Sequence, residues 1–161
     1  MNDKPEISKW QSSLLVALRF LLGWYLLYEG IYKFLDPEWS SIAFLAESTW
    51  IFKGVADWII SNPGVLDAVD FLNTWGLTAI GLGLILGLFT KVAAIAGCAL
   101  LALYYLFNPP FIGFGTTIPL EGNYLLVNKT LIEAVMLLLI AVSPSARLFG
   151  LDMLLYNRKN K

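Results

Sequence analysis

Four apolar stretches run through this chain of 161 residues and constrain its fold more than any other feature. They cover about residues 13–34, 71–89, 92–107 and 124–142. A helix needs roughly 20 apolar residues, or as few as about 17, to span about 30 Å of hydrocarbon. Hydrophobic residues make up 58% of the chain and charged residues only 14%, far from the balance of a soluble domain. The sequence therefore predicts an all-α integral membrane protein built as a four-helix bundle.

The connection between the first two stretches, residues 35–70, has a different character. Trp39, Trp50 and Trp58 are interleaved with serine, glutamate, lysine and aspartate, and Asn62-Pro63-Gly64 indicates a turn. Tryptophan commonly anchors amphipathic helices at the level of the lipid headgroups. We therefore expect short interfacial helices in this outer loop, before the second span.

Cations are distributed unevenly over the connecting segments. If four helices cross the membrane, one side carries Lys4, Lys9, Lys91, Arg147, Arg158, Lys159 and Lys161. The other side is mostly acidic, with Lys53 as its clear loop cation. Because lysine and arginine are enriched in cytoplasmic loops, both termini are predicted to lie in the cytoplasm. The first stretch is then a retained signal-anchor helix.

The composition excludes several functional classes. The chain has no histidine and a single cysteine, Cys98, so a zinc site, a histidine-ligated haem, an iron–sulfur cluster or a Cys-x-x-Cys pair would lack its ligands. We therefore expect no metal and no haem. A net charge of -1 also argues against a nucleic-acid partner, which would require a clustered basic surface.

Five ionisable side chains fall inside the predicted spans, and they are the candidate functional residues: Arg19, Glu29, Lys33, Lys129 and Glu133. A charge at mid-membrane costs about 2.5 kcal/mol or more, so such residues usually have a function or a partner. On the first span, Arg19, Gly23, Leu26, Gly30 and Lys33 share one helical face.

Spacing and depth bring these charges to one level. Glu29 and Lys33 are four residues apart, and Lys129 and Glu133 repeat that spacing, so each pair can form an ion pair. If the first and last spans are neighbours, the two pairs meet beneath the outer loops, close to Asn123 and Asn128. The sequence therefore predicts a polar pocket in the outer leaflet, formed by Lys33, Lys129, Glu29, Glu133 and the two asparagines.

Simpler interpretations exist for most of these residues. Arg19 is near the cytoplasmic end and is expected to snorkel to the headgroups. Lys33 can act as an interfacial anchor at a helix C-terminus, and Lys129–Glu133 can be a purely structural salt bridge. The glycines of the second span indicate close helix contact, and Cys98 is expected to be a packing residue.

Several segments resemble the DoxX/DoxD membrane family. The first is Arg19-Phe20-Leu21-Leu22-Gly23-Trp24, followed by Glu29-Gly30-Ile31-Tyr32-Lys33-Phe34. The second is Asn73-Thr74-Trp75-Gly76-Leu77 with Gly87-Leu88-Phe89-Thr90-Lys91. The third, and the most specific, is residues 122–133, which include Asn128-Lys129 and Glu133. The similarity extends over nearly the whole chain, and the long outer loop with its tryptophans is closer to the DoxD type.

Resemblance to DoxD implies the large membrane subunit of a thiosulfate:quinone oxidoreductase. Such an enzyme oxidises thiosulfate to tetrathionate and passes the electrons to a quinone. The resemblance implies that the anionic substrate would be bound by Lys33, Lys129, Asn123, Asn128 and Arg19, and that Glu29 and Glu133 would exchange protons with the quinone. It would lie in the prokaryotic cytoplasmic (inner) membrane, with a second small subunit or a further copy of the chain as partner. The alternative is a non-catalytic membrane anchor or assembly partner of a redox or export complex, with the charges acting as structural links.

Overall fold

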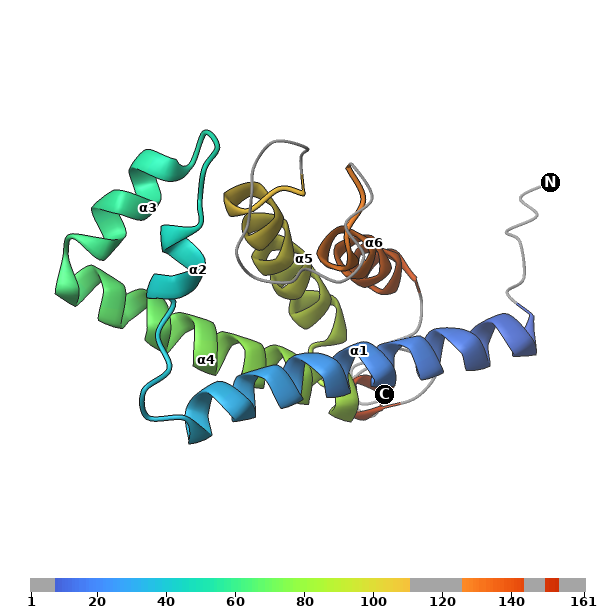
Figure 1. Ribbon diagram of the computed structural model, residues 1–161. Helices are drawn as coiled ribbons and strands as arrows, with labels where there is room; N and C mark the ends of the chain where they lie inside the picture. Colours follow the sequence, from blue (N-terminus) through green and yellow to red (C-terminus); the bar gives the residue numbers. More distant parts are fainter. Residues whose placement is uncertain (1–7, 111–125, 144–149, 154–161) are drawn as a thin grey trace.

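The computed structural model of the chain describes residues 8–110, 126–143 and 150–153. The main helices are α1 (Lys9–Leu35), α2 (Ile42–Ala46), α3 (Lys53–Ile60), α4 (Pro63–Leu86), α5 (Thr90–Phe107) and α6 (Lys129–Val142). Figure 1 shows α1 and α4 side by side and antiparallel, with α2 and α3 above the start of α4. Within the described ranges, α1, α4 and α5 are long and apolar enough to cross a membrane.

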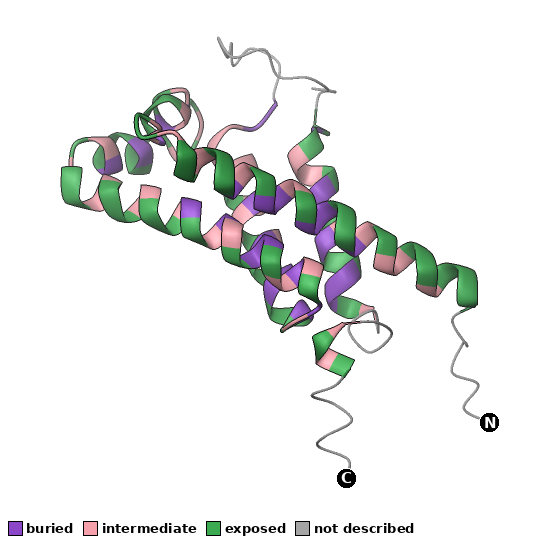
Figure 2. Ribbon diagram, turned by 90° about the horizontal axis from the view of Figure 1, so that it is seen from below, coloured by how far each residue is buried: buried purple, intermediate pink, exposed green. Residues whose placement is uncertain are grey.

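The four longest helices share one hydrophobic core. Its buried residues come from α1, α4, α5 and α6: Leu22, Leu26, Leu77, Ile80, Leu84, Ala93, Ala94, Leu101, Ala134, Leu137, Ile140 and Ala141. Figure 2 shows the buried residues gathered where these helices meet, while the outward faces are exposed. Those faces carry large apolar side chains such as Leu21, Leu86 and Val135. An apolar core inside an apolar surface confirms the predicted all-α membrane protein.

The predicted small-residue face of α1 packs directly on α4. A methyl group added at Gly23 would meet Leu84, and one added at Gly30 would overlap Thr78. From the other side, a methyl group at Gly81 would overlap the backbone of Leu27. These glycines therefore let the two backbones approach closely, as the sequence predicted.

The boundaries of two predicted spans are wrong. The second was predicted to begin near residue 71, but α4 begins at Pro63, because proline is favoured at the first position of a helix and the preceding Asn62 is the N-cap. The fourth was predicted from residue 124, but residues 126–128 are not helical and α6 begins at Lys129. With 14 residues, α6 is about 21 Å long, which is shorter than the hydrocarbon layer.

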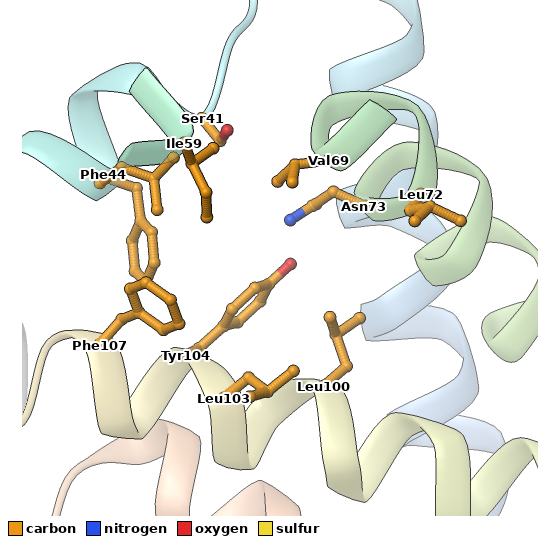
Figure 3. Close-up of a pocket in the computed structure, with 11 residues that line it drawn as sticks. Ser41, Phe44, Ile59, Val69, Leu72, Asn73, Leu100, Leu103, Tyr104 and Phe107 are labelled. Atoms are coloured by element: carbon orange, nitrogen blue, oxygen red, sulfur yellow. The ribbon is translucent and has the colours of Figure 1, made fainter. Parts of the chain in front are cut away.

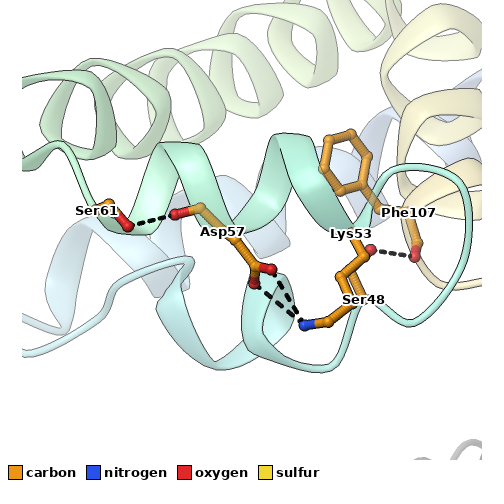
Figure 4. Close-up of polar contacts among 5 residues, drawn as sticks. All are labelled: Ser48, Lys53, Asp57, Ser61 and Phe107. Atoms are coloured by element: carbon orange, nitrogen blue, oxygen red, sulfur yellow. Dashed lines mark hydrogen bonds and ion pairs between the residues drawn. The ribbon is translucent and has the colours of Figure 1, made fainter.

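The expected short helices of the outer loop are present as α2 and α3, and they form a packed cap. Leu45, Ala56 and Ile59 make a second small core, against which Phe107 of α5 packs. The Ser48 hydroxyl donates to the Phe107 carbonyl at 2.9 Å (Figure 4). The cap is therefore attached to the ends of α4 and α5 rather than separate from the bundle.

A tight turn joins α4 to α5. The sequence suggested that the glycines of this span mediate helix contact, but Gly87 has another role. It is the C-cap of α4 and has the left-handed conformation, with φ 62°, which glycine adopts without strain. Asp152 holds the next turn, since its carboxylate accepts the backbone N–H groups of Phe89 and Thr90, both at 2.8 Å.

Candidate functional site

Lys33, near the end of α1, lies between three helices and the loop before α2. Its Nζ donates to Oδ1 of Asn73 on α4 at 2.9 Å. The same nitrogen lies 4.7 Å from the ring centroid of Trp39 and 5.6 Å from that of Tyr104 on α5. We call these four residues the Lys33 cluster. An ammonium group over aromatic faces is held by cation–π attraction, so this lysine has a fixed position.

A cavity of about 280 Å³ adjoins the Lys33 cluster, between α4, α5 and the cap. Its lining is largely apolar and aromatic: Ser41, Phe44, Leu45, Ile59, Val69, Leu72, Asn73, Leu100, Leu103, Tyr104 and Phe107. Figure 3 shows the Tyr104 hydroxyl and the Asn73 amide pointing toward each other among the apolar side chains that line the cavity. That hydroxyl is buried, and within residues 8–110, 126–143 and 150–153 it makes no hydrogen bond of ordinary geometry, although the Asn73 amide is near enough to interact with it. A buried hydroxyl without a partner is costly and invites a ligand.

The cavity also reaches the outer surface of the bundle. Leu72 and Leu103 line it, and they are 67% and 48% exposed, respectively. Both belong to helices that are long enough to cross a membrane. A ligand with a polar ring and an apolar tail would therefore have its ring inside and its tail among the lipid chains.

Lys129 and Glu133 form a second cluster, on α6. Their ion pair measures 3.7 Å, and Lys129 Nζ lies 4.1 Å from the ring centroid of Tyr25 on α1. The predicted pairing of these two residues is confirmed. The lysine side chain is 61% exposed, whereas that of the glutamate is 12% exposed. The three residues, named here the Lys129 cluster, line one end of a groove of about 550 Å³ between α1 and α6.

Glu29 lies on α1 between the two clusters. It is one helical turn from Tyr25 on one side and from Lys33 on the other. It acts electrostatically on Lys33, Lys129 and Glu133. The predicted Glu29–Lys33 ion pair does not form in the described part of the chain, because Lys33 turns to Asn73 instead. The single predicted charge cluster is thus two clusters with Glu29 between them.

The two predicted asparagines have different outcomes. Asn128 is buried, and its side chain accepts the backbone N–H of Leu131 at 2.9 Å as the N-cap of α6. This bond satisfies one free donor of the helix terminus, which leaves that side-chain oxygen engaged. Asn123 lies outside the described residues.

Arg19 does not belong to either cluster. It precedes Lys33 by 14 positions on α1, which corresponds to about 21 Å along the helix axis. The expectation that it snorkels to the surface is wrong, since its side chain is only 2% exposed. It faces the bundle near the α4–α5 turn, where Asp152 is an electrostatic partner. The carboxylate of Asp152, which follows α6 in the chain, offsets part of the desolvation cost of burying the Arg19 cation.

Several site residues were not singled out from the sequence: Tyr25, Trp39, Asn73 and Tyr104. Asn73 was visible as a polar residue within a span, and it was quoted only as part of the family resemblance. The two tyrosines had no comparable signal, because aromatic residues are common throughout membrane helices. Their role depends on which helix faces they occupy, and this becomes known only from the packing.

The described residues contain no group of three or more histidine, cysteine, aspartate or glutamate side chains placed to hold a metal ion. They offer instead hydrogen-bond donors and carboxylates beside an apolar cavity. Such a set can bind a carbonyl compound and move protons.

Comparison with protein families gives one match, a family model described as DoxX, over residues 14–108. The comparisons with curated proteins and with solved structures gave no match. The family match covers α1 to α5 and ends before α6, so it includes the Lys33 cluster and Glu29 but not Lys129 and Glu133. Because the match spans more than half of a chain with several apolar helices, the protein belongs to the DoxX family of multi-pass membrane proteins.

Proposed function

We propose that this DoxX protein is the membrane subunit of a quinone-linked oxidoreductase and that the cavity beside the Lys33 cluster receives the quinone ring. The observation that carries the proposal is the cavity itself, with apolar and aromatic walls and the polar groups of Asn73 and Tyr104 among them. Small-molecule sites commonly have this composition, with few polar groups that fix orientation.

The dimensions support a ring head group. Ligand pockets usually measure about 300–1,000 Å³, and about 280 Å³ is near the lower end of that range. A ring carbonyl oxygen can accept a hydrogen bond from the Tyr104 hydroxyl. The Lys33 ammonium group lies 5.6 Å from the centroid of the Tyr104 ring. Phe44 and Phe107 supply aromatic walls on the side of the cap, and the exposed Leu72 and Leu103 mark the exit for an isoprenoid tail.

The electron donor in the proposal is thiosulfate, which the DoxD resemblance suggests. Two thiosulfate ions lose two electrons and join as tetrathionate, while one quinone takes up two electrons and two protons to give the quinol. A dianion requires positive charge and donors, for which Lys33, Lys129 and Asn128 are the candidates. Arg19 is not included in this site, because it lies at the opposite part of α1.

The cellular arrangement in the proposal follows from the charge asymmetry of the loops. Both termini face the cytoplasm, and the cap of α2 and α3 lies at the outer surface of a prokaryotic inner membrane. A second small subunit or a further copy of the chain completes the path of electrons from thiosulfate.

Turnover and binding with purified protein test the proposal. The protein is reconstituted in lipid and mixed with thiosulfate and a short-chain quinone, and quinone binding is also measured separately by tryptophan fluorescence. Tyr104→Phe should weaken quinone binding about tenfold, because one hydrogen bond to a buried group is lost. Tyr28→Phe is the matched control, since Tyr28 is 61% exposed on the outer face of α1.

Leu103→Trp provides a second variant that acts by volume rather than by chemistry. The larger side chain fills the cavity and should abolish binding of the ring. If the wild-type protein binds no quinone in any lipid, and a second protein co-purifies with it, the non-catalytic anchor or assembly role is the correct one.

A further inference from the structure

Glu29 lies on α1 between the two lysine clusters and acts electrostatically on both. Tyr25, Glu29 and Lys33 follow one another at intervals of four along α1, so their side chains form a row on one side of the helix. One end of the row contacts the Lys129 cluster, since Lys129 lies over the Tyr25 ring. The other end contacts the cavity, since Lys33 bonds to Asn73 and lies over Tyr104. The row therefore connects the α1/α6 groove with the cavity.

Charges alternate along this connection. Lys33, Glu29, Lys129 and Glu133 carry positive, negative, positive and negative charge, which balance one another in a low-dielectric surrounding. An electron that arrives in the cavity upsets this balance, and a proton that follows it restores neutrality. Uptake of protons through the same row of residues is therefore favoured by electrostatics.

We propose that Glu29 relays protons from the α1/α6 groove to the cavity, so that the groove, and not the cap, is the proton entrance. This inference rests on the proposed quinone function. Lys33 or Tyr104 donates a proton to the ring oxygen as electrons arrive from the reductant, here thiosulfate. Glu29 takes up a proton from the groove and passes it to the group that donated, which leaves Glu29 a carboxylate again. Two such cycles accompany two electrons, which balances quinone to quinol.

The exposure of the groups sets the direction of the relay. Lys129 is the first residue of α6 and is 61% exposed, so in the proposed orientation the groove end of the row lies at the outer end of that helix, where water can supply protons. The Tyr104 hydroxyl at the cavity end is buried. Asp70 of α4 also acts on Lys33, but its carboxylate accepts from the backbone N–H of Ser41 at 3.0 Å and from the Ser41 hydroxyl. Because the Asp70 carboxylate already accepts these hydrogen bonds from Ser41, Glu29 is the better candidate to carry the proton.

Electrochemically induced infrared difference spectroscopy tests the relay with electrons supplied by an electrode, so that the result does not depend on the natural donor. Quinone-loaded wild-type protein should show a carboxyl signal on reduction, and Glu29→Gln should lose it. Proton uptake, followed with a pH-indicating dye, should slow at least tenfold in Glu29→Gln with quinone binding unchanged. Glu29→Asp should restore uptake in large part, and Glu38→Gln, which alters an exposed carboxylate before α2, should behave as wild type.

The outcomes separate the two proposals. If the wild type binds and reduces quinone while Glu29→Gln keeps the carboxyl signal and the uptake rate, the relay is wrong and the quinone function stands. If the wild type binds no quinone, the function is wrong and the relay falls with it. If Glu29→Gln fails to fold, Glu29→Asp tests the relay instead. Its shorter side chain lies farther from Tyr25 and Lys33, so proton uptake should be measurably slower than in the wild type. A rate equal to that of the wild type overturns the relay.

Discussion

Lys33 and Lys129 both lie beside a tyrosine ring of this bundle, but their surroundings are opposite. Lys33 is half-buried, donates to the neutral amide of Asn73, and has no carboxylate at ion-pair distance within the described residues. Lys129 is mostly exposed and has Glu133 at 3.7 Å. Lys33, the more buried lysine, is thus held by neutral groups, whereas Lys129, the more exposed lysine, is held by a carboxylate.

The comparison shows that the partner, more than the exposure of the lysine, should decide the effect of its removal. Replacing Lys33 by an apolar residue breaks no direct ion pair among the described residues. Replacing Lys129 leaves the buried carboxylate of Glu133 without compensation. The more exposed lysine should therefore contribute more to stability, and the more enclosed lysine more to ligand binding.

Close packing of α1 on α4 encloses Lys33, and its disruption should have the largest effect. Gly81→Val places a side chain against the backbone of Leu27 and should lower the free energy of unfolding by about 3 kcal/mol. Gly76→Val is the matched control, because nothing lies within 4 Å of a methyl group added there. Unfolding in mixed detergent micelles measures both; equal losses would show that the α1–α4 contact is not tight.

Removal of Lys129 should have the next largest effect. Lys129→Met leaves Glu133 buried without its partner and should cost about 2 kcal/mol, less than a fully buried pair because the lysine is exposed. The double variant Lys129→Met/Glu133→Gln should recover most of this loss in the same unfolding assay. A double variant as unstable as the single one would contradict the ion-pair explanation.

Removal of Lys33 should change stability by less than about 1 kcal/mol. In Lys33→Met, the unsatisfied Asn73 oxygen costs free energy, while the desolvation of the ammonium group is no longer needed, so the two contributions offset each other. Quinone binding measured on the same sample should nevertheless fall. A loss of stability larger than that of Lys129→Met would reverse the comparison between the two clusters.

The exposed pair Lys53–Asp57 on α3 provides the baseline for a surface ion pair. The two residues are four apart at 3.2 Å, and both side chains are more than half exposed, at 57% and 56% (Figure 4). Lys53→Met should cost about 0.5 kcal/mol or less, and added salt should reduce the effect further. Unfolding at low and high salt checks this value; a cost close to that of Lys129→Met would remove the distinction between surface and buried partners.

Much of the fold could be predicted from the sequence, but less of the site. Local properties were confirmed within the described residues: three of the four apolar stretches form helices long enough to cross a membrane, the small-residue face of α1 packs on α4, and Lys129 pairs with Glu133. Asn73 and Tyr104 were missed as partners of Lys33, and Arg19 was placed at the surface although Asp152 lies near it in the fold. Each of these errors concerns contacts between residues far apart in the chain.

Hydropathy and helical spacing by themselves determined that this protein is a membrane helix bundle and that its charges stand at intervals of four. These properties are sums over neighbouring residues, so they can be read before the chain is folded. Only the tertiary structure decided that Lys33 turns toward α4 and α5 while Lys129 turns toward α1. That choice depends on how each helix is rotated about its axis, and the rotation is set where glycines let the backbones of distant segments meet.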